Sequence, residues 1–124
     1  MIETIYKITC LPTKKCYIGR TKKTLEERLK NHFSDAKNDP ATYKRPLGIA
    51  IRYYGIDNFV IEKIAEIQGN NIYELNLKEQ EYIKQYNTFF PYGYNVSGLK
   101  NQKLKFMREY LDRRFYINGI SYEI

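Results

Sequence analysis

Residues 4–20 read TIYKITCLPTKKCYIGR, in which two short segments rich in β-branched and aromatic residues flank a proline-containing turn. Residues 3–9 alternate between polar and apolar side chains, and residues 15–20 do the same, as strands with one buried face do. Residues 12–15 between them, PTKK, supply the turn. The sequence therefore predicts a β-hairpin at the start of the chain.

Two helices are predicted after the hairpin. Thr24 and Glu27 have the spacing of a capping box, which predicts a helix that begins there and runs to about Asn38. Pro46 is expected in the first turn of a second helix, because that turn does not need the N–H that proline lacks. Gly55 is expected to end this second helix.

A third strand and a third helix complete the predicted core. Residues 58–67, NFVIEKIAEI, predict a strand. Asn71 is expected to cap a helix that runs to about Asn87. The predicted fold class is therefore α/β, with a small antiparallel sheet of about three strands flanked by helices.

The chain changes character after Gly98, which suggests one domain over residues 1–98 and an extension over residues 99–124. Residues 100–114 are rich in lysine and arginine and have a narrow apolar face at helical spacing, so they predict a basic helix. Residues 115–122 predict a small hairpin on an Asn-Gly turn. The basic helix either packs on the domain with a solvated outer face or contacts DNA phosphates. We favour the second interpretation, with three candidate contacts: Lys103, Lys105 and Arg108.

Composition indicates the class of protein and of partner. A chain of 124 residues with 43% hydrophobic residues is long enough for one domain with its own core. The formal net charge of +7 favours a polyanionic partner such as nucleic acid. Many small proteins are basic without binding nucleic acid, so charge alone does not decide the function.

Several kinds of site and location are disfavoured by the sequence. Two cysteines and one histidine fall short of the four ligands of a structural zinc site. No segment approaches the ~20 apolar residues of a membrane span, so no membrane partner is expected. The N-terminus lacks the basic and then apolar pattern of a signal peptide. We expect an intracellular protein of the cytoplasm or nucleoid, or a virus-associated one, and not a secreted one.

Glu79 stands where the third helix should be apolar. It interrupts a stripe of spacing i, i+7, i+8, i+11 formed by Leu75, Tyr82, Ile83 and Tyr86. A carboxylate at a half-buried position needs a cation or hydrogen-bond donors. A hard divalent cation is the leading candidate, and an arginine or a tyrosine hydroxyl is the alternative. Glu81 is a second candidate ligand, but it is expected on the polar helix face.

Four further polar side chains are expected near one another. Tyr6 and Tyr17 lie on the two arms of the predicted hairpin, and Arg28 and His32 lie one turn apart on the first helix. The ordered set resembles the GIY-YIG nuclease superfamily over residues 3–98. The matching segments are Thr4-Ile5-Tyr6, Tyr17-Ile18-Gly19 after ten intervening residues, the helix around Arg28, AIRYYGIDNF, KEQEYIKQYN and Gly93-Tyr94-Asn95.

The resemblance implies an active site of six side chains, namely Tyr6, Tyr17, Arg28, His32, Glu79 and Asn95. It implies that Glu79 binds the metal ion and that Asn95 closes the site. Three basic residues are expected either to contact phosphate or to be merely solvated, namely Arg20, Lys22 and Lys23. Thr4 stands where the family has its first glycine. Because a strand tolerates threonine, we expect a local change in packing and no loss of activity.

The expected function is a metal-dependent DNA endonuclease, with Mg²⁺ or Mn²⁺ as cofactor. Water would attack the phosphodiester while Arg28 neutralises the developing charge. Tyr6 is the favoured base, directly or through water, and this requires nearby cations to lower the pKa of its hydroxyl from about 10. Tyr17 would orient the water. His32 is the alternative base, because its ordinary pKa lies near 6.5.

Other functions remain open at this point. A single site cuts one strand, so double-strand cleavage requires a homodimer or two sequential events. A non-catalytic nucleic-acid-binding module with the same fold, a structure-specific nuclease that needs a partner protein, and an enzyme acting on RNA are the alternatives.

Overall fold

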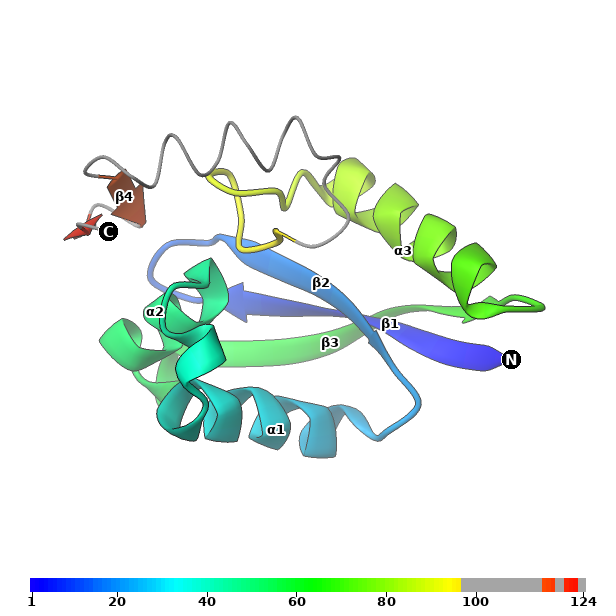
Figure 1. Cartoon of the computed structure of the whole chain (residues 1–124), viewed down its shortest axis with the longest axis horizontal. Helices are drawn as coiled ribbons and strands as arrows, with labels where there is room; N and C mark the ends of the chain where they lie inside the picture. The colour runs from blue at the N-terminus through cyan, green and yellow to red at the C-terminus, as the bar shows by residue number, and fades with distance from the viewer. Residues whose placement is uncertain (97–114, 118–119, 123–124) are drawn as a thin grey trace.

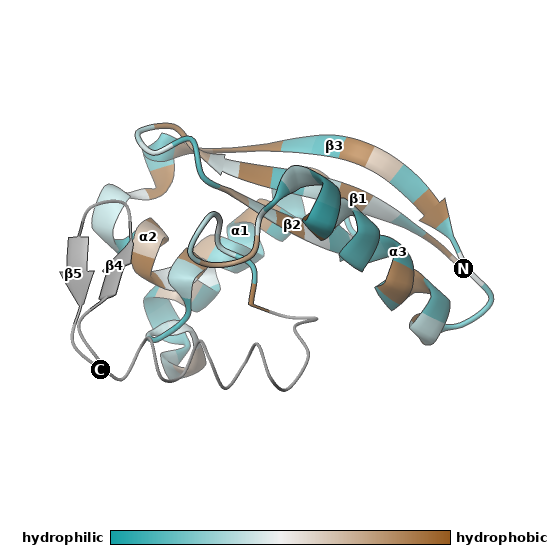
Figure 2. Ribbon diagram, turned by 90° about the horizontal axis from the view of Figure 1, so that it is seen from above, coloured by the Kyte–Doolittle hydropathy of each residue, from teal (hydrophilic) through white to brown (hydrophobic). Residues whose placement is uncertain are grey.

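The predicted hairpin forms two strands of a three-stranded antiparallel sheet. In the computed structural model, which describes residues 1–96, 115–117 and 120–122, strand β1 (Ile2–Cys10) lies between β2 (Cys16–Thr21) and β3 (Phe59–Gln68). The predicted α/β architecture with a three-stranded sheet is therefore confirmed. Figure 2 shows the alternation of hydropathy along the strands from which the sheet was predicted.

Helices α1 (Leu25–Asn38) and α2 (Pro46–Tyr54) cover one face of this sheet (Figure 1). The side chains of Tyr6, Ile8 and Cys10 on β1 are buried against these helices. The apolar residues that the helices contribute to this cluster include Leu25, Leu29, Phe33, Ala36, Leu47 and Ile51. Short 3-10 turns at Pro40–Thr42 and Ile56–Asn58 precede and follow α2.

Helix α3 (Ile72–Tyr86) lies on the opposite face of the sheet (Figure 1). Ile5 of β1, Leu75 and Ile83 are buried there in a second, smaller cluster. The predicted apolar stripe of α3 is confirmed at its centre, but Tyr86 is 39% exposed at the helix end.

The helix ends follow the predicted capping residues. The side chain of Thr24 accepts a hydrogen bond from the backbone N–H of Glu27 at 3.2 Å. Asn71 does the same for α3, and Gly55 follows α2 with a φ of 84°, a conformation that favours glycine. Thr24 and Asn71 thus mark the beginnings of α1 and α3, and Gly55 marks the end of α2.

Residues 88–96 run along the outer edge of β2. The backbone N–H of Tyr94 donates to the carbonyl of Cys16 at 2.9 Å. The amide of Asn95 pairs with both backbone groups of Ile18: its Oδ1 accepts from the N–H and its Nδ2 donates to the carbonyl, each at 2.8 Å. A Cβ at Gly93 would lie 2.6 Å from the backbone of Thr88, so only glycine allows this close approach.

The C-terminal hairpin is confirmed as two paired antiparallel strands, β4 (Phe115–Ile117) and β5 (Ile120–Tyr122). The predicted Asn-Gly turn between them and the predicted basic helix over residues 100–114 lie outside the described residues. Among the residues that the structure describes, none of the helices has the length and apolar character needed to cross a membrane.

Candidate active site

Four of the six predicted side chains converge on the α1 face of the hairpin. The Tyr6 hydroxyl accepts a hydrogen bond from Arg28 Nε at 3.1 Å and lies 2.8 Å from His32 Nε2. The ring of Tyr17 stands edge-on to that of His32, with centroids 5.3 Å apart, and its centroid is 6.3 Å from that of Tyr6. Tyr6 is completely buried, whereas Tyr17, Arg28 and His32 are half-buried.

Strand register and one glycine place these side chains together. Tyr6 lies opposite Gly19 in the β1–β2 ladder, and Ile8 lies opposite Tyr17, so both tyrosines share one face. A Cβ at Gly19 would lie 2.3 Å from the Tyr6 hydroxyl oxygen. The Tyr6 ring therefore crosses directly over Gly19 to reach α1. The sequence identified Gly19 as part of a motif but did not predict this role.

Burial controls the protonation of the tyrosine cluster. Burial raises the pKa of Tyr6 well above its ordinary value, and Arg28 opposes this rise without cancelling it. Arg28 thus lowers the pKa of Tyr6, as expected of a neighbouring cation, but in the chain by itself burial has the larger effect. Burial also raises the pKa of Tyr17. Both tyrosines thus carry their protons at neutral pH.

His32 is neutral under the same conditions. Burial, together with the charge of Arg28, lowers its pKa to about 4. Arg28 can only donate to the Tyr6 oxygen, so the Tyr6 hydroxyl keeps its own proton free to donate to His32 Nε2 in the tautomer whose Nε2 is unprotonated. In that tautomer the arrangement is a proton path from Tyr6 to a neutral imidazole.

Glu79 lies in a second cluster, on the α3 face of the sheet. Arg20 Nη1 contacts Glu79 Oε2 at 3.0 Å, and Arg20 Nε lies 3.4 Å from Glu3 Oε2. Arg20 also donates to Asn76. Arginine was one of the partners predicted for Glu79, and the side chain of this glutamate is only 22% exposed. Arg20 itself, predicted to contact phosphate, forms ion pairs with two carboxylates.

The two clusters influence each other across β2. The negative charge of Glu79 adds to the rise in the pKa of both Tyr6 and Tyr17. Burial raises the pKa of Glu79, while Arg20 and, more weakly, Arg28 lower it. The site therefore occupies both faces of the sheet at the β2 edge.

The acidic residues of this region fit magnesium or manganese better than zinc. Among the described residues no group of three His, Cys, Asp or Glu side chains is placed to hold a metal ion. Mg²⁺ is commonly held by one or two carboxylates, with water and substrate phosphate as its other ligands. Glu79 meets this requirement, because within the described part of the chain its Oε1 forms no hydrogen bond while Oε2 contacts Arg20.

The remaining predicted residues are distributed as follows. Asn95 is buried with its amide committed to Ile18 and Thr88, so it fixes the β2 backbone between Tyr17 and Gly19. Lys22 and Lys23 are exposed in the connection from β2 to α1. The predicted DNA contacts on the basic helix lie outside the described residues, namely Lys103, Lys105 and Arg108.

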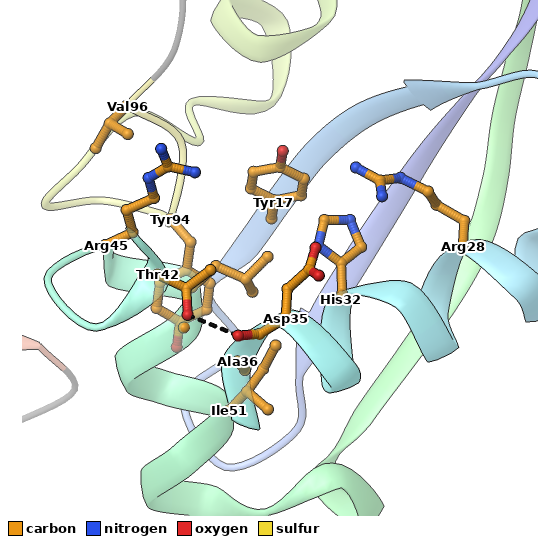
Figure 3. Close-up of a pocket in the computed structure, with 12 residues that line it drawn as sticks. Tyr17, Arg28, His32, Asp35, Ala36, Thr42, Arg45, Ile51, Tyr94 and Val96 are labelled. Carbon is orange, nitrogen blue, oxygen red and sulfur yellow. Dashed lines mark hydrogen bonds between the residues drawn. The ribbon is translucent and has the colours of Figure 1, made fainter. Parts of the chain in front are cut away.

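A pocket of about 420 Å³ adjoins the tyrosine cluster (Figure 3). Tyr17, Arg28 and His32 line part of it, and Asp35 and Arg45 line another part. The sequence analysis missed the last two residues. Asp35 follows His32 at helical spacing i+3, which is a local signal that would have found it. Arg45 comes from the start of α2 and has no comparable signal.

Comparison with known proteins gives matches in sequence and in structure. The model of the GIY-YIG catalytic domain matches residues 3–95. The MSV199 domain-containing protein 146R of Invertebrate iridescent virus 6 is 38% identical over 72 residues, which make up 58% of this chain and 28% of that protein. Protein 019R of the same virus is 33% identical over 86 residues, 68% of this chain and 29% of that protein. The chain thus spans less than a third of the length of these relatives.

Solved structures of one catalytic domain have the same fold. A variant of the catalytic domain of intron endonuclease I-TevI superposes with a TM-score of 0.64 and 25% identity, covering 81% of this chain and 98% of that domain. The catalytic domain of homing endonuclease I-TevI gives a TM-score of 0.60 at 24% identity, with coverage of 77% and 98%. The three-stranded sheet and its helices account for nearly all of that domain.

Proposed function

The chain belongs to the GIY-YIG catalytic domain family, and from that premise we propose that it is a metal-dependent DNA endonuclease. The observation that best supports this is the pairing of a neutral proton acceptor with an uncompensated arginine. His32 Nε2 lies 2.8 Å from the Tyr6 hydroxyl and accepts its proton in the tautomer with an unprotonated Nε2, and Arg28 contacts the same hydroxyl. Glu79 adds a carboxylate across β2. A module that only binds nucleic acid has no need of a carboxylate, which repels phosphate.

Arg28 supplies the positive charge for the phosphate. Its hydrogen-bond partner is the neutral Tyr6 hydroxyl, and it forms no ion pair within the described residues. A guanidinium in this state can donate to the phosphate oxygens as their negative charge grows during attack. Because the Tyr6 hydroxyl is completely buried in the free chain, its contact with the attacking water would require Arg28 to turn towards the phosphate.

Tyr6 and His32 together remove the proton from that water. As the water oxygen bonds to phosphorus, its proton moves to the Tyr6 oxygen and the Tyr6 proton moves to His32 Nε2. Tyr6 therefore never has to exist as a free phenolate, so its raised pKa is compatible with this role. Tyr17 orients the water, and the bond from phosphorus to the leaving sugar oxygen breaks.

Glu79 is the residue that would hold the metal ion. When bound, Mg²⁺ or Mn²⁺ supplies Lewis-acid stabilisation of the charge on the phosphate and the leaving oxygen. Arg20 fixes the position of the Glu79 carboxylate by its contact with Oε2, and Glu3 in turn holds Arg20. Asn95 acts on the position of β2 and not on the substrate.

The nuclease domain is proposed to comprise residues 1–98, with residues 99–124 as a basic extension that contacts DNA phosphates. One active site cuts one strand, so a single chain makes nicks, and a double-strand break needs two copies or two events. The match covers less than a third of each of the two viral relatives, and we propose that target recognition is supplied by a segment or a partner protein outside this chain. Their origin in an iridescent virus supports the expectation of an association with a virus.

The test is cleavage of supercoiled plasmid by the full chain with Mg²⁺ and with EDTA. We expect nicked circles with Mg²⁺ only, and their loss in Glu79→Ala. Glu81→Gln is the matched control, because Glu81 lies exposed on the same helix and should cut like the wild type.

Two results would contradict the proposal. Cleavage that persists in Glu79→Ala would remove this residue as the metal ligand. A wild-type chain that binds plasmid but cuts neither plasmid nor branched DNA would favour the non-catalytic binding module. RNA of the same sequence, digested in parallel, decides between the two nucleic acids.

A further inference from the structure

The pocket beside Tyr17 continues beyond the residues assigned to the reaction. Its volume of about 420 Å³ is in the range of small-molecule binding pockets, whereas the reacting phosphate group alone would fill only part of it. Arg28 and His32 line it on the side of the tyrosine cluster, and Arg45 lines it from the start of α2 (Figure 3). Tyr17 lies between these two sides. The space between α1 and α2 therefore connects two cationic side chains.

Arg45 differs from Arg20 and Arg52 in having no partner for its charge among the described residues. Arg20 forms ion pairs with two carboxylates, and Arg52 donates to backbone carbonyls of Ala36 and Tyr43. Arg45 is exposed and makes no side-chain hydrogen bond or ion pair within the described part of the chain. Its charge is close enough to lower the pKa of Tyr17. Arg45 is thus an uncompensated cation beside the site.

The remaining lining is of two kinds. Ala36, Leu47 and Ile51 form an apolar part, which suits the flat face of a sugar or base. Asp35 brings a carboxylate to the pocket between the two arginines. Because a carboxylate repels phosphate, Asp35 disfavours a phosphate in the space between the two arginines. Phosphates are therefore expected beside the arginines themselves.

We propose that this pocket binds the nucleotide next to the cleaved bond, with Arg45 contacting the neighbouring phosphate of the same strand. Arg28 then contacts the phosphate being cut, and the intervening sugar and base lie along Tyr17 and the apolar lining. Arg45 is a positioning residue for the strand. This inference rests on the proposed function, and it adds the path of the strand across the site, from Arg28 past Tyr17 to Arg45.

The test combines a side-chain change with a change in the DNA. Arg45→Gln is compared with Lys44→Gln, an adjacent exposed lysine that does not line the pocket. Each is assayed on oligonucleotides in which one phosphate near the cut is replaced by an uncharged methylphosphonate. Single-turnover rates at several enzyme concentrations, with Mg²⁺, separate weaker binding from slower chemistry.

In Arg45→Gln, the enzyme concentration needed for half-maximal rate should rise about 10-fold to 100-fold, with little change in the maximal rate. A factor of this size is expected for the loss of one charged hydrogen bond. The uncharged linkage beside the cut should weaken binding by the wild type by a similar factor. It should not weaken binding by Arg45→Gln any further, because the contact is already lost. Lys44→Gln should behave as the wild type does on every oligonucleotide.

Two outcomes overturn the inference. Unchanged kinetics in Arg45→Gln would remove Arg45 from the substrate path. If the side-chain change and the uncharged linkage each weakened binding and their effects added up when combined, the two changes would concern different contacts. A thermal melt shows whether the variant is folded, and Arg45→Lys, which keeps the charge, should recover part of the binding.

Failure of the proposed function gives a different result. In that case the wild type cuts no oligonucleotide. The same comparison of variants and linkages is then made on binding affinity in EDTA, where a contact between Arg45 and the phosphate still produces the non-additive pattern.

Discussion

Arg28 of α1 and Arg20 of β2 lie on opposite faces of the sheet, and they differ in whether a carboxylate compensates their charge. Arg28 contacts a neutral phenol and forms no ion pair within the described residues, whereas Arg20 contacts the carboxylates of Glu79 and Glu3. Both residues were expected from the sequence to act on phosphate. Of the two, Arg28 is the one whose charge no carboxylate compensates within the described residues. A basic residue near a site is therefore informative only once its partners are known.

The two faces also differ in how they respond to protons. On the α1 face, burial keeps His32 and the tyrosines neutral. On the α3 face, Glu79 is stabilised as an anion by Arg20 against the effect of burial. The site thus combines an uncharged half that can transfer protons with an ionic half that can hold a cation.

The largest expected effect separates the two arginines. Arg28→Lys should lower the cleavage rate about 10²-fold to 10³-fold, because an ammonium cannot reproduce the planar donors of a guanidinium on the phosphate. Arg20→Lys keeps an ion pair with Glu79 and should lower the rate by less than about 10-fold. Single-turnover kinetics on one oligonucleotide measure both. Equal losses of cleavage rate in the two variants would show that Arg28 and Arg20 do not differ in this way.

The response of stability to pH should differ in sign between the two faces. The pKa of His32 is about 4 in the folded chain and near 6.5 when unfolded, so the unfolded chain binds more protons between these values. Stability is therefore lost as the pH falls from about 6.5 to 4, by about 3 kcal/mol at most from this group. His32→Gln should make this loss smaller, as measured by urea unfolding at several pH values.

Glu79 should act in the opposite direction. Its pKa is raised in the folded chain, so its contribution to stability grows as the pH falls. Glu79→Gln should then make the acid-induced loss of stability steeper, in the same urea experiment. If the acid-induced loss of stability became smaller in both His32→Gln and Glu79→Gln, the two faces would not differ in this way.

Gly19 tests whether the α1 face depends on the close crossing of Tyr6. Gly19→Ala places a methyl group 2.3 Å from the Tyr6 hydroxyl oxygen. We expect a loss of about 1–3 kcal/mol in the free energy of unfolding, as for overpacked cores. Cleavage should fall further than stability explains, because the displaced hydroxyl no longer meets His32. Gly55→Ala is a control for the backbone, since Gly55 has open space around it and only its positive φ is strained.

The smallest expected effect concerns Glu3. Glu3→Gln removes one of the two carboxylates of Arg20 and should cost no more than about 1 kcal/mol in the free energy of unfolding. Cleavage should change little if Glu3 acts only by holding Arg20. A loss as large as that of Glu79→Ala would instead indicate that Glu3 holds the metal ion too. Thermal melts and plasmid nicking on one preparation answer both points.

The features predicted correctly from the sequence are those with local signals. Thr24, Asn71 and Gly55 mark helix ends through their own backbone and side-chain chemistry. Arg28 and His32 share a face because they are four residues apart, and the strand pattern of the hairpin brought the tyrosines to that face. The interrupted apolar stripe of the third helix singled out Glu79, and the family resemblance then connected it with the tyrosines and supplied Asn95.

The features that were missed depend on contacts between distant segments. Glu3 and Glu79 meet only through Arg20, and nothing near any of the three predicts this. The pKa of Tyr6 depends on how completely α1 and β2 cover it, which is a property of the whole fold. Arg45 reaches the pocket because α2 packs beside α1.

The amide of Asn95 has a consequence for assembly. Edge strands with free backbone groups tend to pair with strands of other molecules. At Ile18 the side chain of Asn95 occupies both backbone groups, as a neighbouring strand would, and Tyr94 does so for the carbonyl of Cys16. The β2 edge is therefore closed to sheet extension beside the active site. Two copies that cut both strands of a duplex must meet through another surface, and aggregation by strand addition is blocked at this edge.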